Sequence, residues 1–155
     1  MKLSKNLTLQ EFKHSNTAKR KGIDNSITPE HLENAKLWAK FIFQPIRDYF
    51  RKPIWLSSGY RSKALNKAIK GSKRSQHCFG EAGDLDNDRT SNPSNDKIFY
   101  FIKDNLDFDQ LIWEYGNDLC PAWVHVSYSS TGVQRNQVLR ARKNKWGRTY
   151  YEPFS

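Results

Sequence analysis

The spacing of apolar residues between positions 28 and 50 predicts an amphipathic helix. Hydrophobic side chains recur there at three- and four-residue steps, which places them on one helical face. They are Leu32, Ala35, Ala39, Ile42, Ile46 and Tyr49. Thr28 can act as the N-cap, and Pro29 suits the first helical position. Because Pro45 lacks a backbone N–H, we expect the helix to be kinked or interrupted near it.

Shorter segments also carry helical signals. Thr8 and Glu11 have the spacing of a capping box, so a short helix is expected to begin there. A second short helix is predicted in "RSKALNKAIKG", where Gly71 ends it. A third, capped helix is predicted in "SNPSNDKIFYFIKDNL". Its inward-facing residues are Ile98, Phe101 and Ile102.

The strand signals lie mainly in the second half of the chain. "PIWLSS" is typical of a buried strand, and "DQLIWEY" and "WVHVSYS" are strand-like runs joined by "GNDLCPA", which indicates a hairpin with a loop. The tail "GVQRNQVLRARKNKWGRTYY" alternates weakly and predicts a final edge strand followed by a basic, aromatic end. There is no internal repeat or linker. We therefore expect one α+β domain over residues 1–155, with a mostly antiparallel sheet flanked by helices.

Composition narrows the function classes. Hydrophobic residues make up 37% of the chain and aromatic residues 14%, which excludes a disordered polymer. The core is expected to include Trp38, Phe41 and Trp55. No apolar run is long enough for a membrane span and no secretion signal is evident, so we expect a protein that is cytoplasmic as synthesised. Its two cysteines, Cys78 and Cys120, are expected to be reduced thiols.

The charge balance favours an anionic partner. The chain has 26 Lys and Arg against 16 Asp and Glu, a formal net charge of +10. Nucleic acid, an acidic polymer and a cell wall all fit this charge, and the charge does not choose among them. We expect the chain to be a monomer.

The stretch "SQHCFGEAGDLD" holds the first candidate metal ligands. His77 and Asp84 are not at helical i, i+4 spacing, so they would need a loop that leads into a strand, and Gly80 and Gly83 allow the backbone to fold close to a metal. The third ligand must come from elsewhere. His125, in the middle of an apolar strand, is the best candidate, because an unpartnered imidazole there would be costly.

Other readings of these residues stay open. His125 could be a satisfied core histidine, and Asp84 could be a turn residue. The two cysteines could join His77 and His125 in a closed structural zinc site, although that would leave Asp84 without a role. The remaining histidines lie in polar, charged contexts and are expected to be solvated. They are His14 and His31.

At this point the chain resembles a known family. The order of "SGYRS", "SQHCFGEAGD" and "WVHVSY", together with "LTLQEF", "QPIRD" and "DQLIWEYG", is similar to the M15-type zinc D-Ala-D-Ala carboxypeptidases and peptidoglycan endopeptidases, especially their compact bacterial and phage branch. The resemblance implies a zinc site on the sheet, held by His77, Asp84 and His125. It also implies that Arg61 helps to hold the carbonyl or carboxylate of the substrate. Arg61 could instead pair with a surface carboxylate.

One position departs from a common pattern of this family. Many relatives place the catalytic glutamate three residues before the last histidine, where this chain has Ala122. A hairpin could bring Glu114 beside His125 instead, so Glu114 is our candidate general base, with Asp86 and Asp109 as reserves. Glu114 could also be a solvated strand residue, and an inactive family member is a further alternative.

The resemblance predicts a zinc-dependent hydrolase that cuts peptide bonds in peptidoglycan stem peptides or cross-links, as a carboxypeptidase or as an endolysin-type endopeptidase. Such an enzyme would act on the cell wall, in a phage after another protein has permeabilised the membrane. The alternative is a basic module without catalysis that binds a wall or, through the tail "RARKNKWGRTYY", nucleic acid. The tail holds no recognised nucleic-acid motif, so nucleic acid is the less favoured partner.

Overall fold

A six-stranded sheet forms the centre of the molecule. The computed structural model describes all residues 1–155, and the strands follow the order β3-β4-β6-β5-β7-β8. Their bounds are Leu56–Ser58 for β3, Ala82–Leu85 for β4, Gln110–Glu114 for β5, Trp123–Ser127 for β6, Gln137–Lys143 for β7 and Thr149–Pro153 for β8. Only β5 and β7 pair in parallel, and the other neighbours are antiparallel. The predicted α+β domain with a mostly antiparallel sheet is confirmed.

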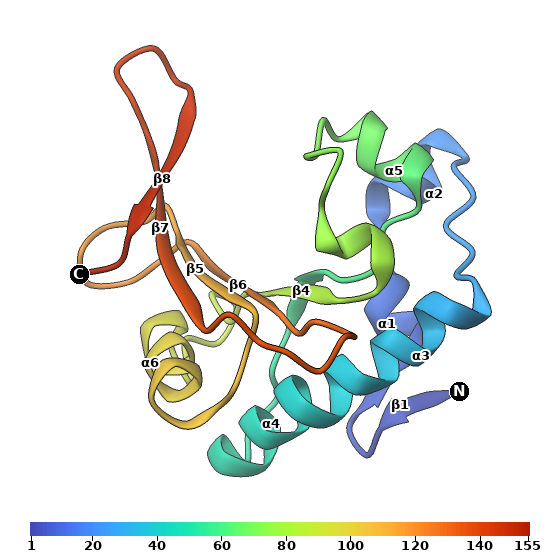
Figure 1. Ribbon diagram of the computed structural model, residues 1–155, viewed down its shortest axis with the longest axis horizontal. Coiled ribbons are helices and arrows are strands. Elements are labelled where there is room, and N and C mark those ends of the chain that lie inside the picture. The colour runs from blue at the N-terminus through green and yellow to red at the C-terminus, as the bar shows by residue number, and fades with distance from the viewer.

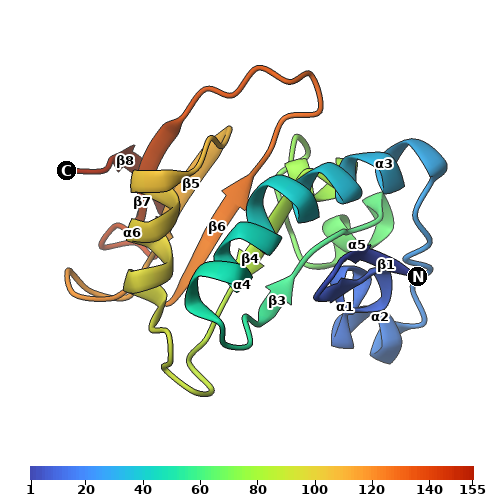
Figure 2. The same cartoon turned by 90° about the horizontal axis from the view of Figure 1, so that it is seen from below.

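Helices cover one face of this sheet (Figure 2). They are α3 (Pro29–Trp38), the π-helical turn η1 (Ala39–Phe43), α4 (Gln44–Phe50) and α6 (Asn95–Asn105). Their apolar side chains form one core with the residues that point to this face from the strands, which are Leu85, Leu111, Trp113, Val124 and Val126. The opposite face of the same strands is left free for a site.

The long helical segment begins and is interrupted where its sequence predicts, although Tyr49 of the predicted apolar face is 64% exposed. Thr28 Oγ accepts a hydrogen bond from the backbone N–H of His31, and Pro29 takes the first helical position. The interruption expected near Pro45 is confirmed, because the five residues of η1 directly precede α4 and the Gln44 N–H reaches back to the Ala39 carbonyl. The wider turn accommodates a proline, which has no N–H to donate.

The N-terminal part packs beside this layer (Figure 1). It consists of β1 (Lys2–Ser4), β2 (Leu7–Thr8), α1 (Leu9–Lys13) and α2 (Asn16–Lys21). The predicted capping box is present at the start of α1, with Thr8 and Glu11 each accepting the other's backbone N–H. The predicted short helix before Gly71 is α5 (Lys63–Ala68). None of the helices combines the length and apolar character that crossing a bilayer requires.

The prediction for the tail was wrong in one respect. The tail forms two strands, β7 and β8, and β7 lies inside the sheet between β5 and β8. The predicted edge strand is therefore internal, and β8 is the edge. The weak alternation hid the turn at Asn144–Gly147, and no local pattern could reveal the parallel pairing of β7 with a strand more than 20 residues earlier.

Several burial predictions also need correction. Trp38 is fully buried, but Phe41 and Trp55 remain 40% and 38% exposed, since Phe41 stacks on Tyr128 at the surface and Trp55 lies under the Arg89 guanidinium. The strand predicted in "PIWLSS" is a half-buried edge strand, because β3 pairs with β4 alone.

Helix α6 differs from its prediction in two details. Ile98 and Ile102 are fully buried as predicted, but Phe99 is fully buried too, whereas Phe101 is only partly buried. Ser94 occupies the N-cap position without a side-chain hydrogen bond to the helix.

Candidate metal centre

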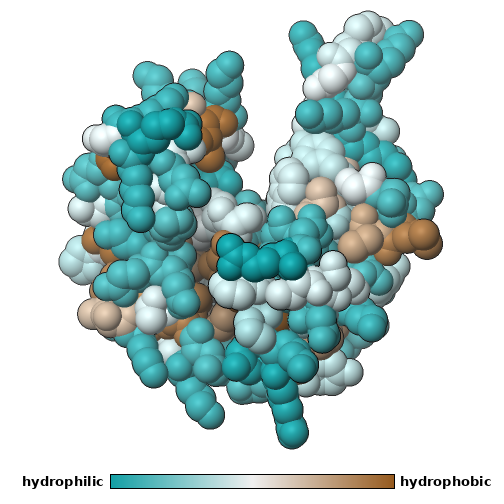
Figure 3. All heavy atoms as spheres, turned by 180° about the vertical axis from the view of Figure 1, so that it is seen from behind, coloured by the Kyte–Doolittle hydropathy of each residue, from teal (hydrophilic) through white to brown (hydrophobic).

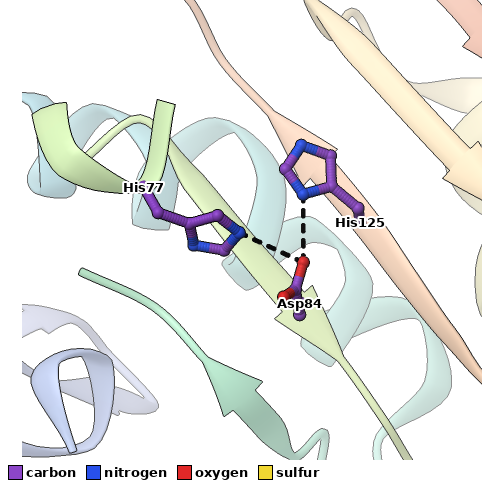
Figure 4. A group of neighbouring side chains, drawn as sticks. All are labelled: His77, Asp84 and His125. Atoms are coloured by element: carbon purple, nitrogen blue, oxygen red, sulfur yellow. Dashed lines mark hydrogen bonds and ion pairs between the residues drawn. The ribbon is translucent and has the colours of Figure 1, made fainter. Parts of the chain in front are cut away.

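Three potential metal ligands meet on the free face of the sheet. His77 comes from the short 3-10 helix η2 (Gln76–Phe79), Asp84 from β4 and His125 from β6. Asp84 and His125 are direct partners in the β4–β6 register. The donor atoms of the three residues all lie within 4.8 Å of one another, and Figure 4 shows both imidazoles directed at the Asp84 carboxylate. The structure thus brings together the three residues that the sequence singled out.

The two glycines between His77 and Asp84 serve the packing of helix α3. Gly80 turns the chain with a φ of +73°, and a Cβ there would lie 2.4 Å from the His31 carbonyl oxygen. A Cβ on Gly83 would lie 2.4 Å from the Trp38 ring. Both contacts are with α3, so packing against this helix is by itself a sufficient reason for glycine at both positions. They position the two ligands by letting η2 and β4 lie close against the helix.

The "SGYRS" segment contacts both the ring and the backbone of His77. The Gly59 carbonyl oxygen lies 2.7 Å from His77 Nδ1, and the Arg61 backbone N–H donates to the His77 carbonyl. A carbonyl can only accept, so Nδ1 carries a proton and the neutral ring presents the lone pair of Nε2. This lone pair lies 3.2 Å from Asp84 Oδ1. At this distance Nε2 and Oδ1 can share a proton, which makes the ring cationic, or bind one metal ion together.

The protonation states also suit a metal. Burial lowers the pKa of His77, which favours the neutral imidazole. Burial alone would raise the pKa of Asp84, but each neighbouring imidazole, when it is protonated, donates to this carboxylate and holds its pKa well below the usual range. Two imidazole nitrogens and one carboxylate oxygen are ligands that zinc takes at catalytic sites, where a fourth position stays open. The residues therefore fit a zinc ion.

The three ligands lie in a groove of about 860 Å³ (Figure 3). Strands β4, β5, β6 and β7 form its floor, and Ile112 and Leu139 lie there beside the polar residues. One wall is the segment from residue 69 to residue 76, which contributes Lys70 and Arg74. The other wall belongs to the β7–β8 hairpin, which projects from the body of the molecule (Figure 1).

Glu114 lines the same groove. The β5–β6 register pairs Ile112 with His125 and Glu114 with Trp123, so Glu114 and His125 point to the same face of the sheet. Glu114 is only 7% exposed. Burial, partly opposed by the His125 charge, raises the pKa of Glu114 to about 7. A carboxyl group with such a pKa can take up and release a proton near neutral pH.

Arg61 contacts one of the ligands. Its Nη2 lies 3.4 Å from Asp84 Oδ2, while its Nε donates to Ser58 Oγ and its Nη1 points to Asn66 Oδ1. The guanidinium also lines the groove. The contact with Asp84 did not follow from the sequence.

The two alternative candidates for the general base, Asp109 and Asp86, interact with other residues. Asp109 forms a two-pronged ion pair with Arg135 and accepts a hydrogen bond from Gln76. Asp86 accepts from the Asn95 side chain. Neither carboxylate lines the groove. Ala122 donates its N–H to the Glu114 carbonyl, so Glu114 lies on the neighbouring strand directly beside the position where many relatives have a glutamate.

The cysteines and the remaining histidines stay outside the ligand group. Neither Cys78 nor Cys120 belongs to the cluster that could hold a metal, and both are free thiols. His14 is exposed, as predicted. His31 was expected to be solvated but is half-buried, with its ring against Tyr60 and Phe79.

Tyr151 is a groove residue that the sequence did not indicate. It lies on β8 opposite Ala141, and Ala141 in turn pairs with Glu114. Partial burial and the nearby Glu114 charge raise the pKa of Tyr151. The only local signal was the weak alternation of the tail.

A family comparison agrees with this geometry. The model of the family described as Peptidase M15 matches residues 5–127, a range that contains all three candidate ligands, Arg61 and Glu114. The chain belongs to the peptidase M15 family. Members of this family are zinc-dependent metallopeptidases, so membership supports zinc-dependent hydrolysis of peptide substrates by this chain. No curated protein matches the chain.

Proposed function

We propose that this M15 peptidase hydrolyses peptide bonds in peptidoglycan stem peptides or cross-links. The observation that carries the proposal is that Glu114, a buried carboxyl group with a pKa of about 7, shares one groove with the His77, Asp84 and His125 cluster. Such an arrangement provides an acid–base group beside a metal site, which is what hydrolysis of an amide needs.

Zinc bound by the two histidines and Asp84 would supply Lewis acidity, which polarises the scissile carbonyl and makes a water molecule more acidic. Glu114 accepts the proton of the attacking water and passes it to the leaving amine. Its burial suits this task, because a carboxylate in a poorly solvated groove is a stronger base than one in water.

Arg61 has two tasks in this proposal. Its contact with Asp84 orients that ligand, and the guanidinium lines the groove, where its N–H groups can donate to a carbonyl or carboxylate oxygen of the substrate. The peptide is thereby held with its scissile carbonyl between the ligand cluster and Glu114.

The charge of the groove supports an acidic peptide as the substrate. Lys70 and Arg74 line one wall and have no ion-pair partner, whereas Arg135 is paired with Asp109. Stem peptides carry free carboxylates, and the net charge of +10 favours an anionic wall.

The decisive experiment is digestion of purified peptidoglycan by the zinc-loaded enzyme, with the fragments identified by mass spectrometry. The masses report which bond is cut, and whether one residue is trimmed or a cross-link is opened. A chelator should abolish the digestion, and added zinc should restore it. If intact walls and their soluble peptides both stay uncut by the zinc-loaded chain, the proposed function is wrong, and a basic binding module becomes the better description.

A further inference from the structure

The β7–β8 hairpin lies beyond the family match, which ends at residue 127, and yet it forms part of the groove. Its residues Thr149 and Tyr151 line the groove together with Tyr115, and the Tyr115 hydroxyl lies 2.5 Å from Thr149 Oγ1. The hairpin therefore extends the groove wall away from the ligand cluster, as the projecting arm in Figure 3 shows.

The tip of this arm is both aromatic and cationic. We define the hairpin tip as Lys145, Trp146 and Arg148, of which Trp146 is 74% exposed. Lys145 Nζ lies 4.6 Å from the centre of the Trp146 ring. Neither basic side chain of the tip has an ion-pair partner, in contrast to Arg142 lower in the hairpin, which pairs with Glu152.

The turn does not depend on these three side chains. Asn144 Oδ1 accepts the backbone N–H groups of Trp146 and Arg148, at 2.9 and 3.0 Å. Gly147, with a φ of +77°, donates its N–H to the Asn144 carbonyl. Asn144 and Gly147 thus hold the turn, and the tip side chains remain available for a ligand in a prearranged position.

We propose that the hairpin tip is a second binding surface for the polymeric substrate, and that its occupant is the glycan–peptide strand of peptidoglycan. A broad, rigid tryptophan ring offers an amphipathic face against which a sugar ring can pack. The two unpaired cations complement the carboxylates of the strand. This inference rests on the proposed function, because it assigns a further contact to the same substrate.

The β7–β8 hairpin connects the groove to the tip, so one substrate strand can contact both during the same reaction. A strand that lies on the tip keeps its stem peptides near the groove, so the effective concentration of the scissile bond rises. We expect a short soluble peptide that is bound at the ligand cluster to gain nothing from the tip. The tip should therefore affect the polymer and leave the short substrate unaffected.

The test compares the variant Lys145→Ala/Trp146→Ala/Arg148→Ala with the parent enzyme, both zinc-loaded. Binding is measured by cosedimentation with peptidoglycan sacculi freed of accessory polymers, in a Glu114→Gln background that prevents digestion. We expect binding about tenfold weaker, equivalent to about 1.4 kcal/mol, and less sensitive to salt. With Glu114 intact, hydrolysis of a short wall-derived peptide should remain at the parent level.

A matched control carries the same kinds of substitution on the helical side, Tyr49→Ala/Lys52→Ala/Lys97→Ala. Tyr49 is 64% exposed there, and both lysines are exposed. This control should bind sacculi like the parent. Equal binding by the tip variant and the parent would overturn the inference, as would a loss seen only with walls that keep their accessory polymers, or only with an oligonucleotide. If neither walls nor soluble peptides are cut, the proposed function is wrong. The cosedimentation assay still measures binding by the tip, so the two failures can be distinguished.

Discussion

The two faces of the central sheet differ sharply although the same strands build both. On β5 and β6, Leu111, Trp113, Val124 and Val126 point to the helices and are fully buried in the core. The residues that alternate with them, including Glu114 and His125, point to the groove. The side chains of a strand alternate between its two faces, so neighbouring residues serve either stability or chemistry. Substitutions on the two faces should therefore have separable effects.

The largest effect is expected from the loss of a metal ligand. His77→Ala and His125→Ala each leave two of three protein ligands, so both variants should lose stoichiometric zinc and peptidase activity. Elemental analysis of the purified proteins measures the zinc, and His14→Ala is the matched control on an exposed histidine. Wild-type zinc content in either variant would remove that residue from the ligand set.

Glu114→Gln should retain zinc and fold but lose most turnover. The amide keeps the size of the side chain and cannot take up the proton, and loss of a general base typically lowers kcat by about 10²–10⁴-fold. Peptide hydrolysis by zinc-loaded protein measures this change. Glu33→Gln, at an exposed position of α3, is the control. A near-normal rate for Glu114→Gln would eliminate Glu114 as the base.

On the helical face, Leu111→Ala should lower stability without altering the chemistry. Leu111 is fully buried, and such a truncation typically costs about 2–5 kcal/mol in the free energy of unfolding. Leu119 is 82% exposed, so Leu119→Ala should change this energy by less than about 0.5 kcal/mol. Denaturant titration measures both. If kcat per folded molecule also drops in Leu111→Ala, the two faces are not separable.

Glu114 should also lower the stability of the zinc-free protein as the pH rises. Its pKa of about 7 in the folded chain lies above the ordinary 4.5, so the folded state holds a proton that the unfolded state has released. The stabilisation from this bound proton is complete below pH 4.5 and is lost as the pH rises through 7. The free energy of unfolding then falls by up to about 3 kcal/mol. His77, whose pKa burial lowers, acts in the opposite direction.

The comparison of wild type with Glu114→Gln isolates this contribution, because both proteins keep His77. We expect the glutamine variant, relative to wild type, to gain stability between pH 5 and 7.5 in thermal or denaturant unfolding with a chelator present. A constant difference across this range would show that Glu114 titrates as an ordinary carboxyl group.

Asp109 joins the sheet to the turn that carries His77. It accepts from Gln76, the residue before His77, and it is held in place by Arg135. Asp109→Asn weakens this connection without touching the ligands, and comparable outer contacts alter metal affinity by about 10–100-fold. Zinc competition with a chromogenic chelator measures the affinity, with Asp104→Asn at an exposed position of α6 as the control. Unchanged affinity would leave Asp109 with a purely structural role.

The sequence by itself determined much of the fold and indicated the candidate residues of the site. The sequence predicts local structure well where a helix cap, a proline or a regular apolar spacing involves only a few neighbouring residues. Examples are the caps at Thr8 and Thr28 and the interruption before Pro45. The strand-like runs "DQLIWEY" and "WVHVSY" indicated a hairpin that could bring Glu114 beside His125, and the register of β5 and β6 puts both residues on one face. The motif order indicated the three ligands, which the structure brings together.

Tertiary structure decided what depends on segments far apart in the chain. The parallel pairing of β7 with β5 made a predicted edge strand internal and placed Tyr151 in the groove. Close packing against α3 explains why Gly80 and Gly83 are glycines. The partners of Asp109 and Arg61 come from segments that meet only in the folded chain. The physical reason is that capping and periodicity act over a few residues, whereas the burial and charge that set the pKa of Glu114 arise only when the whole sheet has formed.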